Sequence, residues 1–274
     1  MSHIEKLIFG KRIASSPASS LPALSAPVKL DGDAQPAIVL EDLCKKYGAH
    51  WAVDEVNFTV PKGWTVGLLG GNGAGKTTTI AMVLGLVVPT AGRAMVLGCD
   101  MAHERHKVLS RMNFESPYVA LPARLTVREN LTIFGRLYGV ADVKARIAQL
   151  TEDFELGDII DRATGRLSAG QKTRVSVAKA LINDPDVLLL DEPTASLDPD
   201  RAEWVRSRLS AYQTRRGATI LLSSHNMPEV EALCDFVVIM SKGRVVAMGR
   251  PRELVERFKC ADLDEVFIYL ARAA

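Results

Sequence analysis

The chain has 274 residues, with 34 Lys plus Arg against 32 Asp plus Glu, so its net charge is only +2. Hydrophobic residues make up 47% and charged residues 24%, the balance of an ordinary globular protein. This near-neutral charge argues against a protein whose main task is to coat nucleic acid, because such binding depends on neutralising many phosphates. We therefore expect no nucleic-acid partner.

Cysteine spacing and hydropathy exclude further classes. The cysteines form no CxxC pair, so we expect neither a zinc site nor a disulfide framework. They are Cys44, Cys99, Cys234 and Cys260. The longest apolar stretch, residues 80–88, is far shorter than the ~18 to 20 residues of a spanning helix. We expect a chain that does not cross a bilayer by itself and that has no secretory signal in residues 1–10.

Composition divides the chain into three parts. Residues 1–36 are rich in Ser, Ala and Pro, which predicts a flexible N-terminal extension. A globular domain is expected over residues 37–250. Residues 251–274 are expected to form a helical tail, because Leu263, Val266, Phe267 and Leu270 share one helix face.

Within the globular domain, apolar alternation and short apolar runs predict strands, and longer periods predict helices. The predicted strands are residues 38–40, 56–60, 65–69, 93–97, 186–190, 219–223, 236–240 and 244–247. Helices are expected around residues 76–87, 169–183, 199–213 and 227–234. Residues 103–165 carry mostly helical patterns and predict an inserted helical subdomain. Alternating strands and helices favour an α/β fold with a mostly parallel sheet flanked by helices.

A glycine-rich segment follows the strand predicted at 65–69. Residues 70–77 read GGNGAGKT and fit the phosphate-loop pattern GxxxxGK[ST]. Glycines let backbone N–H groups approach phosphate oxygens, and the helix that follows adds its positive N-terminal end. Lys76 is expected to reach the phosphates and Thr77 to ligate Mg²⁺. The residues expected to bind nucleotide here are Gly70, Gly71, Asn72, Gly73, Ala74, Gly75, Lys76, Thr77 and Thr78.

A second segment suits the same chemistry. Residues 187–190 are an apolar run typical of a buried parallel strand, and Asp191 and Glu192 follow it directly. Ligands bind beyond the carboxyl ends of such strands. Asp191 is expected to hold Mg²⁺, and Glu192 to act as the base that orients and deprotonates the attacking water.

Between these segments, residues 167–171 read LSAGQ. With this motif, over about residues 37–250, the chain resembles the ATP-binding subunits of ABC transporters, whose signature reads LSGGQ; Ala169 stands at the third place. The resemblance implies a P-loop ATPase with an antiparallel N-terminal β part. It also implies that Ser168, Gly170 and Gln171 contact ATP bound by a second copy. Ser168 and Gln171 also have the spacing of a helix-capping box.

The resemblance carries further residues. Residues 196–198 look like the loop at the dimer interface, which includes Asp198. His225 looks like the switch histidine that contacts the γ-phosphate, and Tyr47 like the aromatic residue that stacks on adenine. The alternatives are a surface histidine at position 225, a packing aromatic at position 47 and a helix N-cap at Asp198, which is compatible with an interface role.

The chain departs from the family pattern at two places. The family usually has a glutamine after the strand that precedes the helical subdomain, and residues 112–118 contain none. Glu115, Ser116 and Pro117 are the candidates for that position, and Glu115 could take over part of its work. Gly71 stands where the family often has proline.

The functional expectation is an ATPase that converts ATP and water to ADP and phosphate and so powers transport. The resemblance implies Mg²⁺, a second copy of the chain and a separate membrane permease, with peripheral attachment at the cytoplasmic face of the inner membrane. Residues 261–267 resemble the tail of exporter ATPases. The alternatives are a non-transport ABC ATPase acting on ribosomes or nucleic acid, a small-molecule kinase and a non-hydrolysing ATP sensor.

Overall fold

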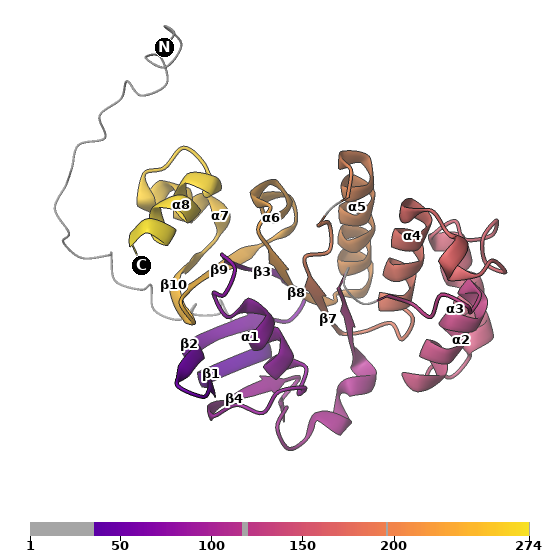
Figure 1. Ribbon diagram of the computed structural model, residues 1–274, viewed down its shortest axis with the longest axis horizontal. Coiled ribbons are helices and arrows are strands. Elements are labelled where there is room, and N and C mark those ends of the chain that lie inside the picture. The colour runs from indigo at the N-terminus through magenta and orange to yellow at the C-terminus, as the bar shows by residue number, and fades with distance from the viewer. Residues whose placement is uncertain (1–35, 117–119, 196, 274) are drawn as a thin grey trace, which may run out of the picture.

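The computed structural model describes residues 36–116, 120–195 and 197–273, and these residues form two sheets (Figure 1). The smaller sheet is antiparallel, with the order β2-β1-β4-β5. Its strands are β1 (Pro36–Tyr47), β2 (His50–Pro61), β4 (Ala91–Val96) and β5 (Cys99–Asp100). The antiparallel N-terminal part expected from the family resemblance is therefore confirmed.

The larger sheet has the order β10-β9-β3-β8-β7-β6. Its strands are β3 (Thr65–Gly70), β6 (Met112–Glu115), β7 (Val187–Asp191), β8 (Thr219–Ser224), β9 (Phe236–Ser241) and β10 (Arg244–Gly249). Every pairing is parallel except that of β9 with β10. This confirms the mostly parallel α/β fold and brings the carboxyl ends of β3, β7 and β8 to one edge.

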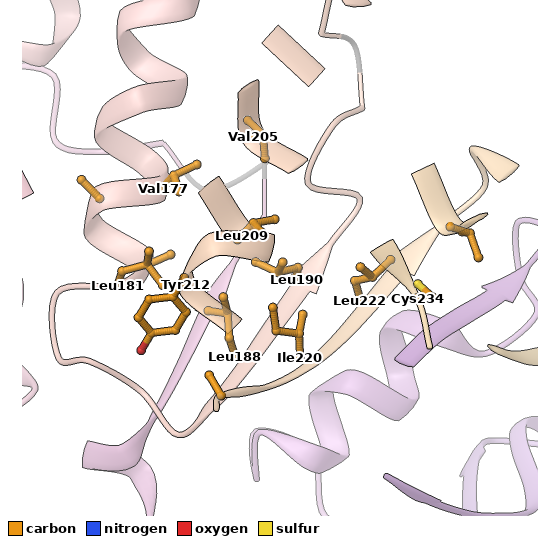
Figure 2. Close-up of a cluster of buried hydrophobic side chains, with 14 of the residues drawn as sticks. Val177, Leu181, Leu188, Leu190, Val205, Leu209, Tyr212, Ile220, Leu222 and Cys234 are labelled. Atoms are coloured by element: carbon orange, nitrogen blue, oxygen red, sulfur yellow. The ribbon is translucent and has the colours of Figure 1, made fainter. Parts of the chain in front are cut away.

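The central strands are buried because helices and the smaller sheet cover both faces of the larger sheet. Alternate residues of β7 and β8 belong to different cores: Leu188 and Leu190 face one, whereas Leu189 faces the other. Figure 2 shows the first core, where these side chains meet Val177 and Leu181 on one side. Burial on both faces explains why β7 reads as an uninterrupted apolar run.

Helices gather at both ends of the molecule and cover both faces of the larger sheet between those ends (Figure 1). Helices α2 (Val127–Leu137), α3 (Val143–Asp153) and α4 (Ala169–Ala180) gather at one end of the molecule. Helices α7 (Pro251–Phe258) and α8 (Leu263–Ala273) lie at the other end. Between them, α5 (Pro199–Arg216) and α6 (Met227–Leu233) pack on one face of the larger sheet, and α1 (Lys76–Val83) packs on the other. The described residues also include short 3₁₀ turns at Arg105–Lys107, Leu109–Arg111 and Thr164–Arg166.

Two expectations need correction. β1 runs over Pro36–Tyr47 rather than residues 38–40, because irregular register at Asp42, whose φ is 45°, interrupts the alternation without ending the strand. The block at 103–165 is not wholly helical, because β6 lies inside it and pairs with β7 in the larger sheet. Of the residues described, no helix is both long and apolar enough to cross a bilayer.

Candidate functional site

The phosphate loop joins β3 to α1 as the sequence predicts. Gly75 is the N-cap of α1 with φ 102°, and no side chain caps this helix end. A Cβ on Gly75 would lie 2.5 Å from the carbonyl oxygen of Ala52, and one on Gly70 would lie 2.7 Å from that of Met240. Glycine is therefore required at both positions, and the first-turn N–H groups of α1 are free of side-chain caps, as anion binding needs.

A cleft of roughly 400 Å³ lies over this loop. The loop, the end of β7 and the start of β2 line it together: His50, Ala52, Gly71, Asn72, Gly73, Ala74, Gly75, Lys76, Thr77, Thr78, Asp191 and Glu192. The two sequence segments expected to handle phosphate and metal therefore meet in one cleft. His50 was not anticipated, although its alternation with Ala52 along β2 places both side chains on the same face.

Lys76 is buried at the floor of the cleft. Its Nζ donates hydrogen bonds to the carbonyl oxygens of Gly70, at 2.6 Å, and Gly71, at 3.2 Å. Burial lowers the pKa of Lys76, and the charges of Glu192 and Asp191 oppose that shift. The ammonium group thus lies in the electrostatic field of both carboxylates.

The carboxylates are held by β8, the strand beside β7. Ser223 Oγ donates to Asp191 Oδ1 at 2.5 Å, and the backbone N–H of Glu192 donates to the carbonyl oxygen of Ser223 at 3.0 Å. Glu192 has φ 54°, a left-handed conformation that costs a residue with a side chain on the order of 1–3 kcal/mol. Contacts with neighbouring residues therefore maintain a backbone conformation of Glu192 that is unfavourable by itself.

His225 does not line the cleft itself, but it contacts Glu192, which does. His225 Nδ1 and Glu192 Oε1 are 3.0 Å apart, and the histidine side chain is 64% exposed. Because an ionised carboxylate only accepts hydrogen bonds, Nδ1 is the donor in this contact when Glu192 is ionised. The structure therefore brings together two residues that lie 33 positions apart.

The signature residues lie elsewhere. Ser168 is the N-cap of α4, and its reciprocal hydrogen bonds with Gln171, at 3.3 Å and 3.0 Å, confirm the predicted capping box. Gly170 lies against Arg201, whose Nε would be 2.9 Å from a Cβ at that position. Among the described residues that line the phosphate cleft, none belongs to the signature.

The cleft lining includes none of the three further residues carried over from the family resemblance: Tyr47, Asp198 and His225. Asp198 caps α5, accepting from the N–H of Arg201 at 3.1 Å, which confirms the N-cap interpretation. Tyr47 is 51% exposed at the end of β1, with Lys45 Nζ 5.2 Å from its ring centre. Because Tyr47 pairs with His50 across the strands, the two side chains share one face of the sheet. Ser196 lies outside the described residues.

Glu115 ends β6, but its carboxylate does not line the phosphate cleft. Glu115 Oε2 lies 2.7 Å from Lys179 Nζ, and Ser176 Oγ donates to Oε1; both partners belong to α4. Ser116 is also buried, and Pro117 lies outside the described residues. Glu115 thus serves a contact between sheet and helix that its sequence position did not reveal.

Fold, phosphate loop and acidic strand end together define a P-loop nucleotide-binding protein. The family described as ABC transporter matches residues 53–195. The chain is 40% identical to a Nod factor export ATP-binding protein I of Ralstonia nicotianae. The alignment covers 85% of this chain and 73% of that protein. It is also 40% identical to the protein of the same name in Burkholderia orbicola, in an alignment that covers 81% of this chain and 74% of that protein.

Solved structures agree. The chain superposes with a TM-score of 0.78 on an ATP-binding subunit of an ABC transporter, at 30% identity, over 85% of this chain and 99% of that one. The chain therefore belongs to the ABC transporter family as an ATP-binding subunit. Such subunits hydrolyse ATP, power transport and pair with membrane permease components.

Proposed function

We propose that this chain drives an exporter by closing as a pair of copies around ATP and Mg²⁺, and that hydrolysis reopens the pair. Export is supported by the names of the Ralstonia and Burkholderia relatives. It is also supported by the tail at residues 261–267, which resembles that of exporter ATPases. The transported compound is chosen by the permease.

The observation that carries the proposal is the separation of the signature from the phosphate cleft. Ser168 and Ala169 are exposed at the start of α4, and the cleft lining of the same chain includes neither them nor Gly170 and Gln171. A γ-phosphate bound beside Lys76 would meet these groups from a second copy. ATP then acts as part of the interface, and loss of the γ-phosphate removes that link.

The donors present fit Mg²⁺. The Thr77 hydroxyl and the Asp191 carboxylate border the same cleft and offer the hard oxygen ligands that this ion prefers. When bound, Mg²⁺ neutralises charge on the phosphate oxygens. Lys76 and the loop N–H groups position the phosphates, and Tyr47 stacks on adenine. Asp198 contributes to the contact between copies.

Glu192 handles the water. Its carboxylate takes the proton at an Oε atom as the water attacks, and the His225 contact at 3.0 Å orients that carboxylate. To donate to a γ-phosphate oxygen, Nε2 must carry a proton as well as Nδ1, so His225 acts there as the doubly protonated ring. Positioning and charge neutralisation supply most of the acceleration, as in phosphoryl transfer generally.

A second groove suits the permease. It encloses roughly 310 Å³ between the end of β7, helices α4 and α5 and the segment before α2. Most of its wall is apolar, including Leu121, Leu167, Val175, Leu190, Val205 and Leu209. We propose that the residues after β6, up to about 165, form a helical subdomain of an ATPase domain at 37–250, flanked by an extension at 1–36 and a tail at 251–274. Docking here holds the chain at the cytoplasmic face of the inner membrane.

Three measurements test the proposal. Purified protein with ATP and Mg²⁺ is expected to release phosphate, and Lys76→Ala is expected to weaken ATP binding in calorimetry. The protein solubilised from its native membrane in detergent is expected to co-purify with a multi-spanning protein. Unchanged ATP affinity in Lys76→Ala would refute the loop assignment, and recovery of ribosomes alone would favour the non-transport alternative.

A further inference from the structure

A buried carboxylate on α6 links the two loops that carry Glu192 and His225. Glu229 lies four positions after His225 and is 1% exposed. Thr194 Oγ1 donates to its Oε1 at 2.7 Å, and Ser224 Oγ donates to its Oε2 at 2.5 Å. One carboxylate thus spans two separate segments of chain.

Each partner stands beside a residue of the site. Thr194 follows Glu192 by two positions, and Ser224 directly precedes His225. Both partners are buried, and Ser224 Oγ also accepts from the N–H of Asn226 at 3.0 Å. Below this layer, the backbone N–H of Glu192 donates to the Ser223 carbonyl oxygen at 3.0 Å. The two loops are therefore joined at two levels, one made by the backbone and one by Glu229.

The use of a carboxylate at this place needs a reason. Removing a carboxylate from water is costly, and two neutral hydroxyl donors return only part of that cost. A buried apolar residue would fill α6 without such a loss, but it would not connect the loops. Meanwhile Glu192 is held at φ 54°, a conformation that neighbouring contacts must maintain.

We propose that Glu229 is a positioning residue for hydrolysis: through Thr194 and Ser224 it fixes Glu192 and His225 at their 3.0 Å contact. It touches neither nucleotide nor water. This inference rests on the proposed roles of Glu192 and His225. Glu229 makes its hydrogen bonds with Thr194 and Ser224 and not with the phosphate loop. We therefore expect turnover to depend on Glu229 and ATP affinity not to depend on it.

The test compares Glu229→Ala, Glu229→Gln and the control Glu231→Gln. Glu231 is exposed on the same helix and lacks the link. Glu229→Ala is expected to lower kcat on the order of tenfold to a hundredfold, because small displacements of catalytic groups have effects of this size. The KM for ATP should change less than about twofold. Glu229→Gln should recover most of the turnover, because an amide accepts from one hydroxyl and donates to the other.

If Glu229→Ala does not fold, Thr194→Val and Ser224→Ala test the inference in its place, because each removes one hydroxyl that donates to Glu229. Each should lower kcat partially, and Thr194→Val combined with Glu229→Gln should be less damaging than the sum of the two changes. Wild-type turnover in folded Glu229→Ala, or in both hydroxyl variants, would overturn the inference. So would a loss of ATP affinity parallel to the loss of kcat. Failure of the wild-type chain to hydrolyse ATP would instead refute the proposed function.

Discussion

The phosphate cleft and the signature end of the molecule are built by different means. The cleft uses backbone: glycines that admit close approach, and strand ends that bring Asp191 and Glu192 to the edge of the larger sheet. The signature uses side chains, with Ser168 and Gln171 capping an exposed helix end. The first region gathers its groups within one chain, whereas the second presents its groups outward. This difference supports the proposal that a second copy completes the site.

Among the tests of this comparison, the largest effect is expected from a substitution at Glu192. Glu192→Gln keeps the shape of the cleft but removes the base, so phosphate release should fall by about 10²- to 10⁴-fold. ATP binding should persist, because Lys76 and the loop are untouched. Steady-state phosphate release and calorimetry on the same preparation measure both quantities. Turnover close to that of the wild type would disprove the role of Glu192.

The buried pair of Glu115 and Lys179 joins β6 of the larger sheet to α4, the helix whose start carries the signature. Lys179→Met leaves the Glu115 carboxylate buried without its cation, which should lower the free energy of unfolding by about 3–5 kcal/mol. Adding Glu115→Gln should recover part of that loss. Urea unfolding of the single and double variants checks this. An equal loss of unfolding free energy in Lys179→Met and in the double variant would show that the unpaired charge on Glu115 does not cause the destabilisation.

The capping boxes at the starts of α4 and α2 separate stability from function. Ser168→Ala and Thr126→Ala each remove an N-cap, at α4 and α2 respectively, and each should cost about 1 kcal/mol of stability. Only Ser168→Ala should also reduce ATP hydrolysis, because Thr126 has no proposed contact with nucleotide. Thermal unfolding and phosphate release, measured on both variants, make the comparison. Equal activity losses would place the effect of Ser168 in folding alone.

A smaller effect is expected on the pH dependence of stability, through Tyr212 in the hydrophobic core. Tyr212 donates to the Pro185 carbonyl oxygen at 2.9 Å, and burial followed by the Asp184 charge raises its pKa well above 10.0. A raised native pKa stabilises the protein fully below pH 10, and that contribution is lost as the pH rises further, at up to about 1.4 kcal/mol per pH unit. Tyr212→Phe should lower stability by about 1 kcal/mol at neutral pH and flatten the alkaline decline.

Unfolding measured between pH 8 and 11 tests this, with the wild-type protein as the reference. The Cys234 thiol, whose pKa burial also raises, contributes to the decline in both proteins and therefore cancels in the comparison. An alkaline decline that is as steep in Tyr212→Phe as in the wild type would exclude Tyr212 as its source.

The parts of the fold that the sequence could predict are those with a local pattern. Residues 187–190 are apolar without interruption because both faces of β7 are buried, and the loop at 70–77 needs glycines for its geometry. β6 was missed because four residues beside helical patterns carry too little periodicity. The full length of β1 was hidden by the irregularity at Asp42.

The contacts that no local pattern reveals join residues distant in sequence. Glu115 meets Lys179 across 64 positions, and Glu229 meets Thr194 across 35. Only the packing of β6 against α4, and of α6 beside the end of β7, determines these pairs. The sequence therefore predicted that the glycine loop and the acidic end of β7 share a cleft, but not that His50 lines it, nor which buried carboxylates hold the surrounding elements.

The central claim is that ATP joins two copies, and sedimentation velocity tests it most directly. Glu192→Gln with ATP and Mg²⁺ should sediment as a dimer, and Glu192→Gln combined with Ser168→Arg should remain a monomer while it still binds ATP. A Glu192→Gln protein that stays monomeric at high concentration, saturated with ATP and with its permease present, would contradict the account.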